Sequence, residues 1–130
     1  MKFEHQKNRS LFKAFYYSIN GIKAAWNGEV AFRQEVILFI LSIPFAVLLG
    51  DSLWQIFSLL AALLFVIVVE LLNSAIEAVV DRTGSDYNIL SGRAKDMGSA
   101  AVLGSLVIAA FMWISLLFEN ILFDLLVVSN

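Results

Sequence analysis

Cysteine is absent from this 130-residue sequence, and histidine occurs once, at His5. Without cysteine the chain can form no disulfide framework, iron–sulfur site or thiolate zinc site. The single histidine near the N-terminus also argues against a histidine-based metal centre and a Ser-His-Asp triad. Charge is scarce too, because only 15% of residues are charged and the net charge is −2. No general positive field is therefore expected to bind nucleic acid.

Two familiar nucleotide-binding patterns are also missing. The sequence contains neither a Gly-x-x-x-x-Gly-Lys-Ser/Thr phosphate loop nor a protein-kinase signature. No early apolar stretch with a small-residue cleavage site indicates a signal peptide. If this chain is a kinase, its fold is therefore not one of those described by these motifs.

Apolar residues are what the sequence has in abundance: 60% are hydrophobic, and the mean hydropathy is +0.82. This share is well above that of a soluble globular domain. We predict an all-α integral membrane protein in which residues 1–130 form a single membrane domain. It should contain an amphipathic surface helix and three transmembrane helices, expected at about 10–27, 30–49, 53–82 and 91–118.

The first of these segments has apolar residues at helical spacing and basic residues between them, among them Lys13 and Lys23. A basic amphipathic helix that carries aromatic side chains is typical of the membrane interface. The alternative is a helix packed on a soluble core, but the rest of the sequence offers no such core.

The three apolar runs differ in length. Val36–Leu49 is short for a span, so the first transmembrane helix should begin near Glu29. The second run extends from about Leu53 to Val69, and the helix is expected to continue beyond it with polar residues. The third run, Met97–Phe118, is uncharged and long enough to span. Capping residues are expected in the Gly50-Asp51-Ser52 turn, at Gly84 and at Ser91.

The basic residues predict the orientation. They precede the first span or lie between the second and third spans, while the Gly50 turn and the C-terminal end have none. The positive-inside rule then places the N-terminus and the 82–96 connector in the cytoplasm and the C-terminus on the opposite side of the membrane. This brings the polar residues of all the helices to one membrane surface.

Four polar residues follow the second apolar run at spacings of three, four and four: Glu70, Asn73, Glu77 and Asp81. This spacing puts them on one stripe of a helix. Ionisable groups at a membrane edge are costly and usually serve a function. The alternative is a polar helix end that pairs its charges, in which Asp81 caps or binds Arg82 and Asn73 joins helices.

Carboxylates at a water–lipid boundary suit Mg²⁺, which often binds through one or two of them together with phosphates. A basic residue such as Lys95 can neutralise phosphate, and a further carboxylate can accept a hydroxyl proton. These are the parts of phosphoryl transfer to a lipid alcohol. Two other classes stay open on this evidence, a small proton-coupled transporter and a non-enzymatic membrane assembly protein.

Four segments (24–26, 29–35, 70–82 and 90–101) resemble the signature of the prokaryotic diacylglycerol kinase family, most closely its Gram-negative members. The resemblance extends from about Lys13 to Phe118. It implies a homotrimer whose active sites are shared between subunits. It also implies ATP-dependent phosphorylation of diacylglycerol to phosphatidic acid, by direct in-line transfer. The alternative within the same fold is an undecaprenol kinase, as in Gram-positive members.

The resemblance also implies roles for individual residues. Glu70 would be the general base, with Asn73 beside it, and Glu29 and Glu77 would hold Mg²⁺. The ATP site would add to these two glutamates Ser10, Tyr17, Asp86, Tyr87, Asn88, Lys95 and Asp96. The lipid would meet, besides Glu70, the residues Ala14, Lys23, Trp26, Ala31, Phe32, Arg33, Gln34, Glu35, Ser99 and Trp113.

Two positions depart from the family pattern: Asn88 stands where relatives carry His, and Ser10 where they often carry Arg, with Arg9 adjacent. Some of the implied residues also have simpler explanations. Tyr17 and Trp113 fit an aromatic belt, and basic residues such as Arg33 and Lys23 follow the positive-inside rule.

Overall fold

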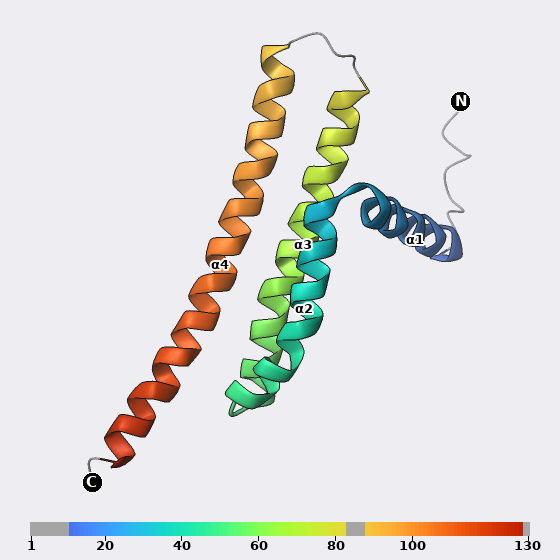
Figure 1. Ribbon diagram of the computed structural model, residues 1–130. Coiled ribbons are helices and arrows are strands. Elements are labelled where there is room, and N and C mark those ends of the chain that lie inside the picture. The colour runs from blue at the N-terminus through green and yellow to red at the C-terminus, as the bar shows by residue number, and fades with distance from the viewer. Residues whose placement is uncertain (1–10, 83–87, 129–130) are drawn as a thin grey trace, which may run out of the picture.

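The computed structural model describes residues 11–82 and 88–128, with side chains described for 12–82 and 88–122. All regular structure in these ranges is helical, as predicted: α1 (Leu11–Gly28), α2 (Val30–Leu49), α3 (Leu53–Asp81) and α4 (Ile89–Val128) (Figure 1). The predicted Gly84 cap and the site residues Ser10, Asp86 and Tyr87 lie outside the described residues.

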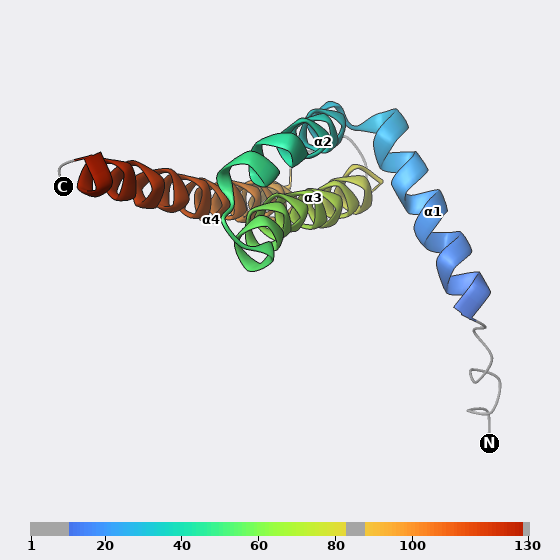
Figure 2. The same ribbon diagram turned by 90° about the horizontal axis from the view of Figure 1, so that it is seen from below.

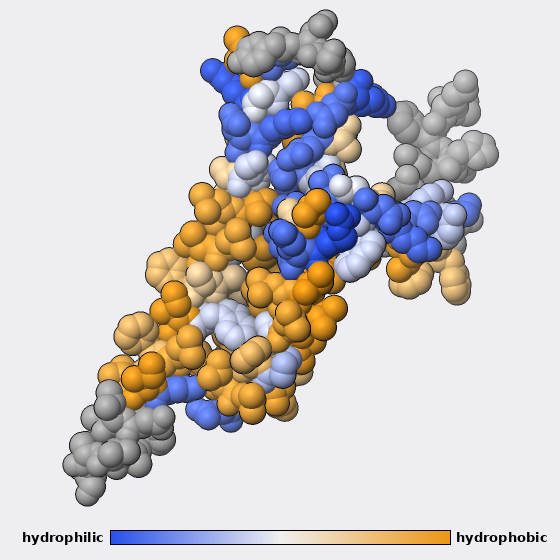
Figure 3. All heavy atoms as spheres, in the orientation of Figure 1, coloured by the Kyte–Doolittle hydropathy of each residue, from blue (hydrophilic) through white to orange (hydrophobic). Residues whose placement is uncertain are grey.

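Three helices are long and apolar enough to cross a membrane, by length and composition: α2, α3 and α4 over Ile89–Leu122. They run side by side, whereas α1 leaves them at a steep angle (Figures 1 and 2). Hydrophilic residues gather where α1 joins, α3 ends and α4 begins, and hydrophobic residues cover most of the remaining length (Figure 3). We call this hydrophilic end the polar end.

Side-chain caps set where two of the helices begin. Ser52 Oγ accepts a hydrogen bond from the Gln55 backbone N–H at 3.2 Å, which confirms the expected cap of α3. At α4 the cap is Asn88, whose Oδ1 accepts from the N–H groups of Leu90 (2.8 Å) and Ser91 (3.3 Å). The expectation of a Ser91 cap was wrong, because Ser91 already lies in the first turn of the helix.

The far end of the bundle is tied together by a contact between distant parts of the chain. Asn120 Nδ2 donates a hydrogen bond to the Leu49 carbonyl oxygen at 2.9 Å. This amide satisfies a backbone acceptor at the end of α2, and α4 continues through Asn120 to Val128, beyond the expected end near 118. The turn beside it requires glycine, because a Cβ on Gly50 would lie 2.6 Å from Ile56 Cγ1.

α3 is the central helix, and it packs against both other spans along its length. Three buried clusters mark these contacts, and each includes small residues that let helix backbones approach closely. The first joins α1, α2 and α3 through Ala25, Phe32 and Ile67. The second joins α3 to α4 through Ala62, Val66 and Ala109. The third joins α2, α3 and α4 through Ala46, Leu59 and Leu116. The first cluster lies beside the polar end and holds α1 near the acidic stripe of α3.

Candidate active site at the polar end

The stripe predicted on α3 runs from the bundle interior out to solvent. Glu70 and Asn73 are buried, with 5% and 8% of their surface exposed. Glu77 is half-buried, and Asp81 at the end of the helix is exposed. A carboxylate that is buried at the start of this stripe and a second that is reachable from water can do different chemistry.

Asn73 links the two parts of the stripe. Its Nδ2 donates a hydrogen bond to Glu77 Oε1 at 3.1 Å, one helical turn further along α3. Its Oδ1 is buried and has no hydrogen-bond partner among the described residues. Asn73 therefore fixes the direction of the Glu77 carboxylate and leaves one acceptor of its own unused.

Glu29 reaches this cluster from the junction of α1 and α2. It occupies the N-cap position of α2, but its carboxylate makes no capping hydrogen bond. The negative charges of Glu77 and Glu29 both act on Glu70, and the charge of Glu70 acts on Glu35 of α2. Residues from α2, α3 and the α1–α2 junction thus form one acidic neighbourhood, in which Glu35 Oε2 is buried without a hydrogen-bond partner in the described part of the chain.

Arg33 of α2 lies at the same junction, with its guanidinium against the C-terminal end of α1. Its Nη1 donates to the carbonyl oxygens of Trp26 at 2.7 Å and Asn27 at 3.4 Å. The last carbonyls of a helix are unsatisfied and carry a partial negative charge, so a guanidinium there is favourable. The sequence predicted a lipid contact for Arg33, and in the structure this side chain joins α2 to α1.

Lys95 and Asp81 form an ion pair between α3 and α4, with Nζ and Oδ1 2.5 Å apart. The expected pairing of Asp81 with its neighbour Arg82 is therefore replaced by a contact across two helices. Asp96, next to Lys95, is exposed. Asn88 at the start of α4 uses its Oδ1 for capping, which leaves its Nδ2 to contact a ligand.

The remaining α1 and α2 residues predicted for the site differ in exposure. Phe32 is 2% exposed and packs in the cluster with Ala25 and Ile67, so it shapes the α1–α2–α3 junction. Tyr17 is exposed and contacts Tyr16 edge to face, with ring centroids 5.9 Å apart. The others are exposed side chains: Ala14, Lys23, Trp26, Ala31 and Gln34.

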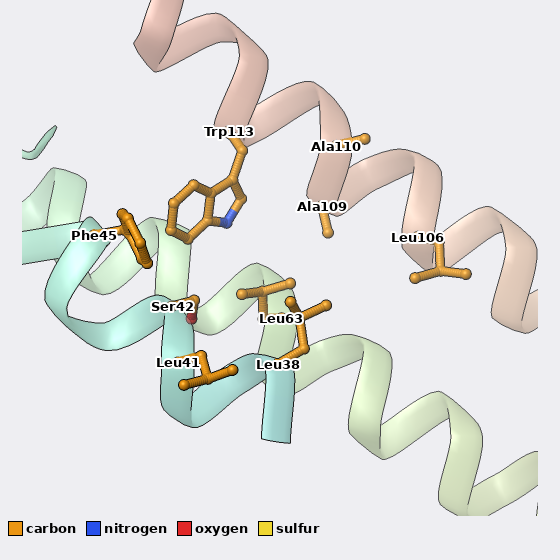
Figure 4. A pocket seen from close by; sticks show the side chains of 9 residues that line it. All are labelled: Leu38, Leu41, Ser42, Phe45, Leu63, Leu106, Ala109, Ala110 and Trp113. Atoms are coloured by element: carbon orange, nitrogen blue, oxygen red, sulfur yellow. The ribbon is translucent and has the colours of Figure 1, made fainter. Parts of the chain in front are cut away.

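Among the hollows between the described helices, two are lined by residues predicted for the site. One, of about 580 Å³, lies between α1 and α3 and is lined by Glu29 and Ser74 among other residues. The other, of about 530 Å³, is almost entirely apolar and lies between α2, α3 and α4. Figure 4 shows the Trp113 indole extending from α4 towards Ser42 and Phe45 of α2 in this second hollow.

Ser99 and Trp113, both predicted to border the lipid, lie far apart on α4. Ser99 is exposed on α4 near the polar end, and Trp113 follows fourteen residues later. At 1.5 Å per residue they are roughly 21 Å apart along the helix. Such a separation places Trp113 away from the acidic neighbourhood.

The described residues contain no group of three or more His, Cys, Asp or Glu side chains arranged to hold a metal ion. Mg²⁺ does not need such a cage, because one or two carboxylates together with substrate phosphates commonly bind it. Glu29 and Glu77 supply the oxygen ligands that this ion prefers, and Asn73 already orients Glu77. The donor set therefore fits a magnesium ion that arrives with a nucleotide.

Sequence reasoning missed three features of this region. Gly98 of α4 is buried directly against Asn73, Ser74 Oγ is buried with no hydrogen-bond partner among the residues that the structure describes, and Asp81 pairs with Lys95. The Gly98 and Asp81 contacts depend on the register between α3 and α4, whereas Ser74 lines the hollow between α1 and α3. A single sequence reveals neither arrangement. The small residues at the start of the third predicted span were the available signal for close helix packing.

The fold and the candidate site together define a class: in the described residues, three helices able to span a membrane and acidic side chains gathered at one end of them. Comparison with known proteins makes this specific. Residues 16–117 match the family described as prokaryotic diacylglycerol kinase. This chain belongs to that family.

Individual relatives agree with this assignment. The diacylglycerol kinase of Escherichia coli K12 is 49% identical over 111 residues, which cover 85% of this chain and 90% of the relative. That of Haemophilus influenzae is 44% identical over 108 residues (83% and 92%). That of Helicobacter pylori J99 is 43% identical over 105 residues (81% and 82%). The predicted family and the prediction of a kinase in a bacterial membrane are confirmed.

Proposed function

We propose that this protein transfers the γ-phosphoryl group of ATP to the hydroxyl of diacylglycerol and so forms phosphatidic acid at the cytoplasmic surface of the inner membrane. The observation that carries the proposal is the buried Glu70, which shares one electrostatic neighbourhood with Glu29 and Glu77 where the apolar part of α3 ends. The names of the relatives support the choice of lipid.

In the proposed reaction the lipid hydroxyl oxygen attacks the γ-phosphorus of ATP. The bond between the γ-phosphorus and the oxygen of the β-phosphate breaks. Glu70 takes the hydroxyl proton, ADP leaves and phosphatidic acid remains. The Glu70 carboxylate suits this role because a lipid hydroxyl at the membrane surface can reach it. Its burial would also shield the proton transfer from bulk water. Asn73 lies beside Glu70 and contributes by orienting Glu77.

Glu29 and Glu77 would hold Mg²⁺, which would offset the negative charge of the ATP phosphates. Lys95 would contact the phosphates after exchanging its exposed partner Asp81 for them. Asp96, Asn88 and Tyr17, with Ser10, Asp86 and Tyr87 outside the described residues, would form the nucleotide site. Breaking the Lys95–Asp81 ion pair costs little free energy, because ion pairs between exposed groups are weak.

The lipid is proposed to lie with its headgroup near Glu35 and Glu70 and its chains along the apolar helices. Ser99 and Trp113, separated along α4, would border one extended chain. α1 would lie in the membrane interface, where its exposed aromatic residues enter the headgroup layer. The remaining predicted lipid contacts, on α1 and the start of α2, would surround the headgroup: Ala14, Lys23, Trp26, Ala31, Phe32, Arg33 and Gln34.

We also propose a homotrimer with active sites completed by neighbouring subunits, the N-terminus in the cytoplasm and the C-terminus in the periplasm. Wide apolar faces of α2 and α4 are exposed in the single chain, and the small residues of α4 permit close packing. Mixing two inactive variants, each altered in a different part of the site, tests the sharing. Recovery of activity in mixed trimers is expected if the sites are composite.

The reaction itself is tested by transfer of labelled γ-phosphate from Mg²⁺–ATP in mixed micelles. Diacylglycerol and undecaprenol are supplied in parallel at equal surface fraction. Glu70→Gln is the test variant, and Asp51→Asn, which alters a carboxylate at the opposite end of the bundle, is the matched control. We expect the first variant to lose diacylglycerol phosphorylation and the second to keep it.

Other outcomes separate the competing functions. Preference for undecaprenol would keep the mechanism and change the lipid. Absence of transfer to either lipid would refute the kinase proposal and favour a proton-coupled transporter or an assembly protein. A transporter would show Glu70-dependent flux without ATP turnover, and an assembly protein would tolerate replacement of Glu29, Glu70 and Glu77.

A further inference from the structure

Gly98 of α4 is buried at the point where this helix faces Asn73 of α3. A Cβ atom at Gly98 would overlap Asn73 Oδ1 and lie 3.3 Å from Asn73 Cγ. The three atoms nearest to such a Cβ all belong to Asn73. The Asn73 amide therefore occupies the space that any other residue at position 98 would need for its side chain.

The orientation of this amide has a consequence for Glu77. Nδ2 is 3.1 Å from Glu77 Oε1 and donates to it, while Oδ1 points into α4 and finds no hydrogen-bond partner among the residues that the structure describes. The contact of Oδ1 with the Gly98 backbone is at most a weak C–H···O interaction. One end of the amide is thus fixed by Glu77, and the other fits only because position 98 has no side chain.

We infer that Gly98 is a positioning residue, whose missing side chain keeps the Asn73 amide directed so that Glu77 is presented to Mg²⁺–ATP. The inference rests on the proposed function, since it takes Glu77 as a ligand of the metal. With alanine at position 98, the Asn73 amide must rotate away from α4. Nδ2 then leaves Glu77, and the Glu77 carboxylate samples other rotamers.

The chain supplies its own controls on the same helix. Cβ atoms at Gly92 and Gly104 would meet nothing within 4 Å. Gly104→Ala therefore adds the same methyl group to α4 without a collision. Any effect of alanine on the backbone of α4 is expected in both variants, whereas the effect on Asn73 is expected at position 98 alone.

The test measures binding of Mn²⁺–ATP to the full-length protein in detergent, from the rise in the water proton relaxation rate that occurs when a Mn²⁺ complex is held by a macromolecule. Mn²⁺ accepts the same oxygen ligands as Mg²⁺. Gly98→Ala should weaken binding roughly tenfold, the size expected when a hydrogen bond to a charged group is lost. Gly104→Ala should stay within about twofold of the wild type, the range of a surface change that disturbs no contact.

A double-mutant cycle shows whether the effect passes through Asn73. In an Asn73→Ala background there is no amide to displace, so Gly98→Ala should produce no further loss of Mn²⁺–ATP binding. Wild-type binding by Gly98→Ala overturns the inference. A Gly98→Ala loss that is equally large in both backgrounds also overturns it.

Folding of each variant is followed by circular dichroism. A Gly98→Ala chain that unfolds alone but folds with Asn73→Ala supports the inference, because removal of the amide restores the space. Unfolding in both backgrounds overturns it, since another neighbour would then require the glycine. Lipid phosphorylation is measured on the same wild-type preparation. Binding of Mn²⁺–ATP without transfer to any lipid would refute the proposed function and leave the role of Gly98 standing.

Discussion

The angle between α1 and the bundle should depend on Arg33. Its guanidinium on α2 donates to two carbonyl oxygens at the end of α1, one at 2.7 Å and one at 3.4 Å. The first distance is that of a strong hydrogen bond and the second that of a weak one. Arg33→Met, which keeps the apolar stem and removes the charge, should release the C-terminal end of α1.

The size of the effect follows from this geometry. A hydrogen bond from a charged donor contributes about 1.5–3 kcal/mol, and partial exposure of Arg33 reduces this to about 1–2 kcal/mol. The balance between docked and detached α1 should then shift roughly 5- to 30-fold towards the detached state. The cluster of Ala25, Phe32 and Ile67 still holds the helix, so the docked state should remain detectable.

The absence of cysteine makes the measurement direct, because spin labels attach only to introduced thiols. Labels at Asn20 on α1 and Gly92 on α4, both exposed, report the distance between α1 and the bundle by pulsed electron paramagnetic resonance. Dilution with unlabelled chains removes distances between subunits. Arg33→Met should broaden the distribution towards other distances, whereas Lys23→Met, which removes a charge from α1 itself, should not. An unchanged distribution in Arg33→Met would refute the assigned role.

Three further outcomes can be checked with single substitutions. Glu70→Gln should lower kcat for lipid phosphorylation by roughly 10²- to 10⁴-fold, as expected for loss of a general base, and should keep ATP binding. Similar losses of kcat and of ATP affinity would instead indicate a collapsed site. Asp81→Asn should leave the melting temperature nearly unchanged and lower the KM for ATP by releasing Lys95, and a raised KM would mean that Asp81 holds Lys95 in place. Asn120→Ala should reduce the free energy of unfolding by about 1 kcal/mol through loss of the bond to the Leu49 carbonyl, and unfolding in a denaturant series would show no change if that contact contributed nothing.

Hydrophobic patterning was enough to predict the four helices, because long apolar runs and turn residues act locally. The position of the Ser52 cap was readable for the same reason. The Asn88 cap was not, since Ser and Asn both lie near the start of α4 and the choice depends on where the preceding connector enters. The contact of Asn120 with the Leu49 carbonyl, 71 positions away in the sequence, was not readable either, because it depends on how α2 and α4 pack.

The acidic stripe of α3 was readable from its spacing alone, and the family resemblance added the candidate residues of the other helices. The partners of these residues were not readable. Asp81 reaches Lys95 on another helix in place of its neighbour Arg82, and Asn73 faces Gly98. These contacts depend on how α3 and α4 are aligned along their axes, which follows from the packing of many small residues together.

The length of α3 has a consequence for the membrane around it. Its 29 residues extend over about 43 Å, whereas a bilayer has a hydrocarbon core of about 30 Å. Glu70 lies seventeen residues after Leu53, or about 26 Å along the axis. If the helix enters the lipid at Leu53 and runs along the membrane normal, the backbone of Glu70 lies about 4 Å short of the opposite boundary of the hydrocarbon, within reach of its side chain. Hydrophobic mismatch would then act on catalysis directly, because a thicker bilayer draws Glu70 below the layer of lipid hydroxyls and a thinner one lifts it into water.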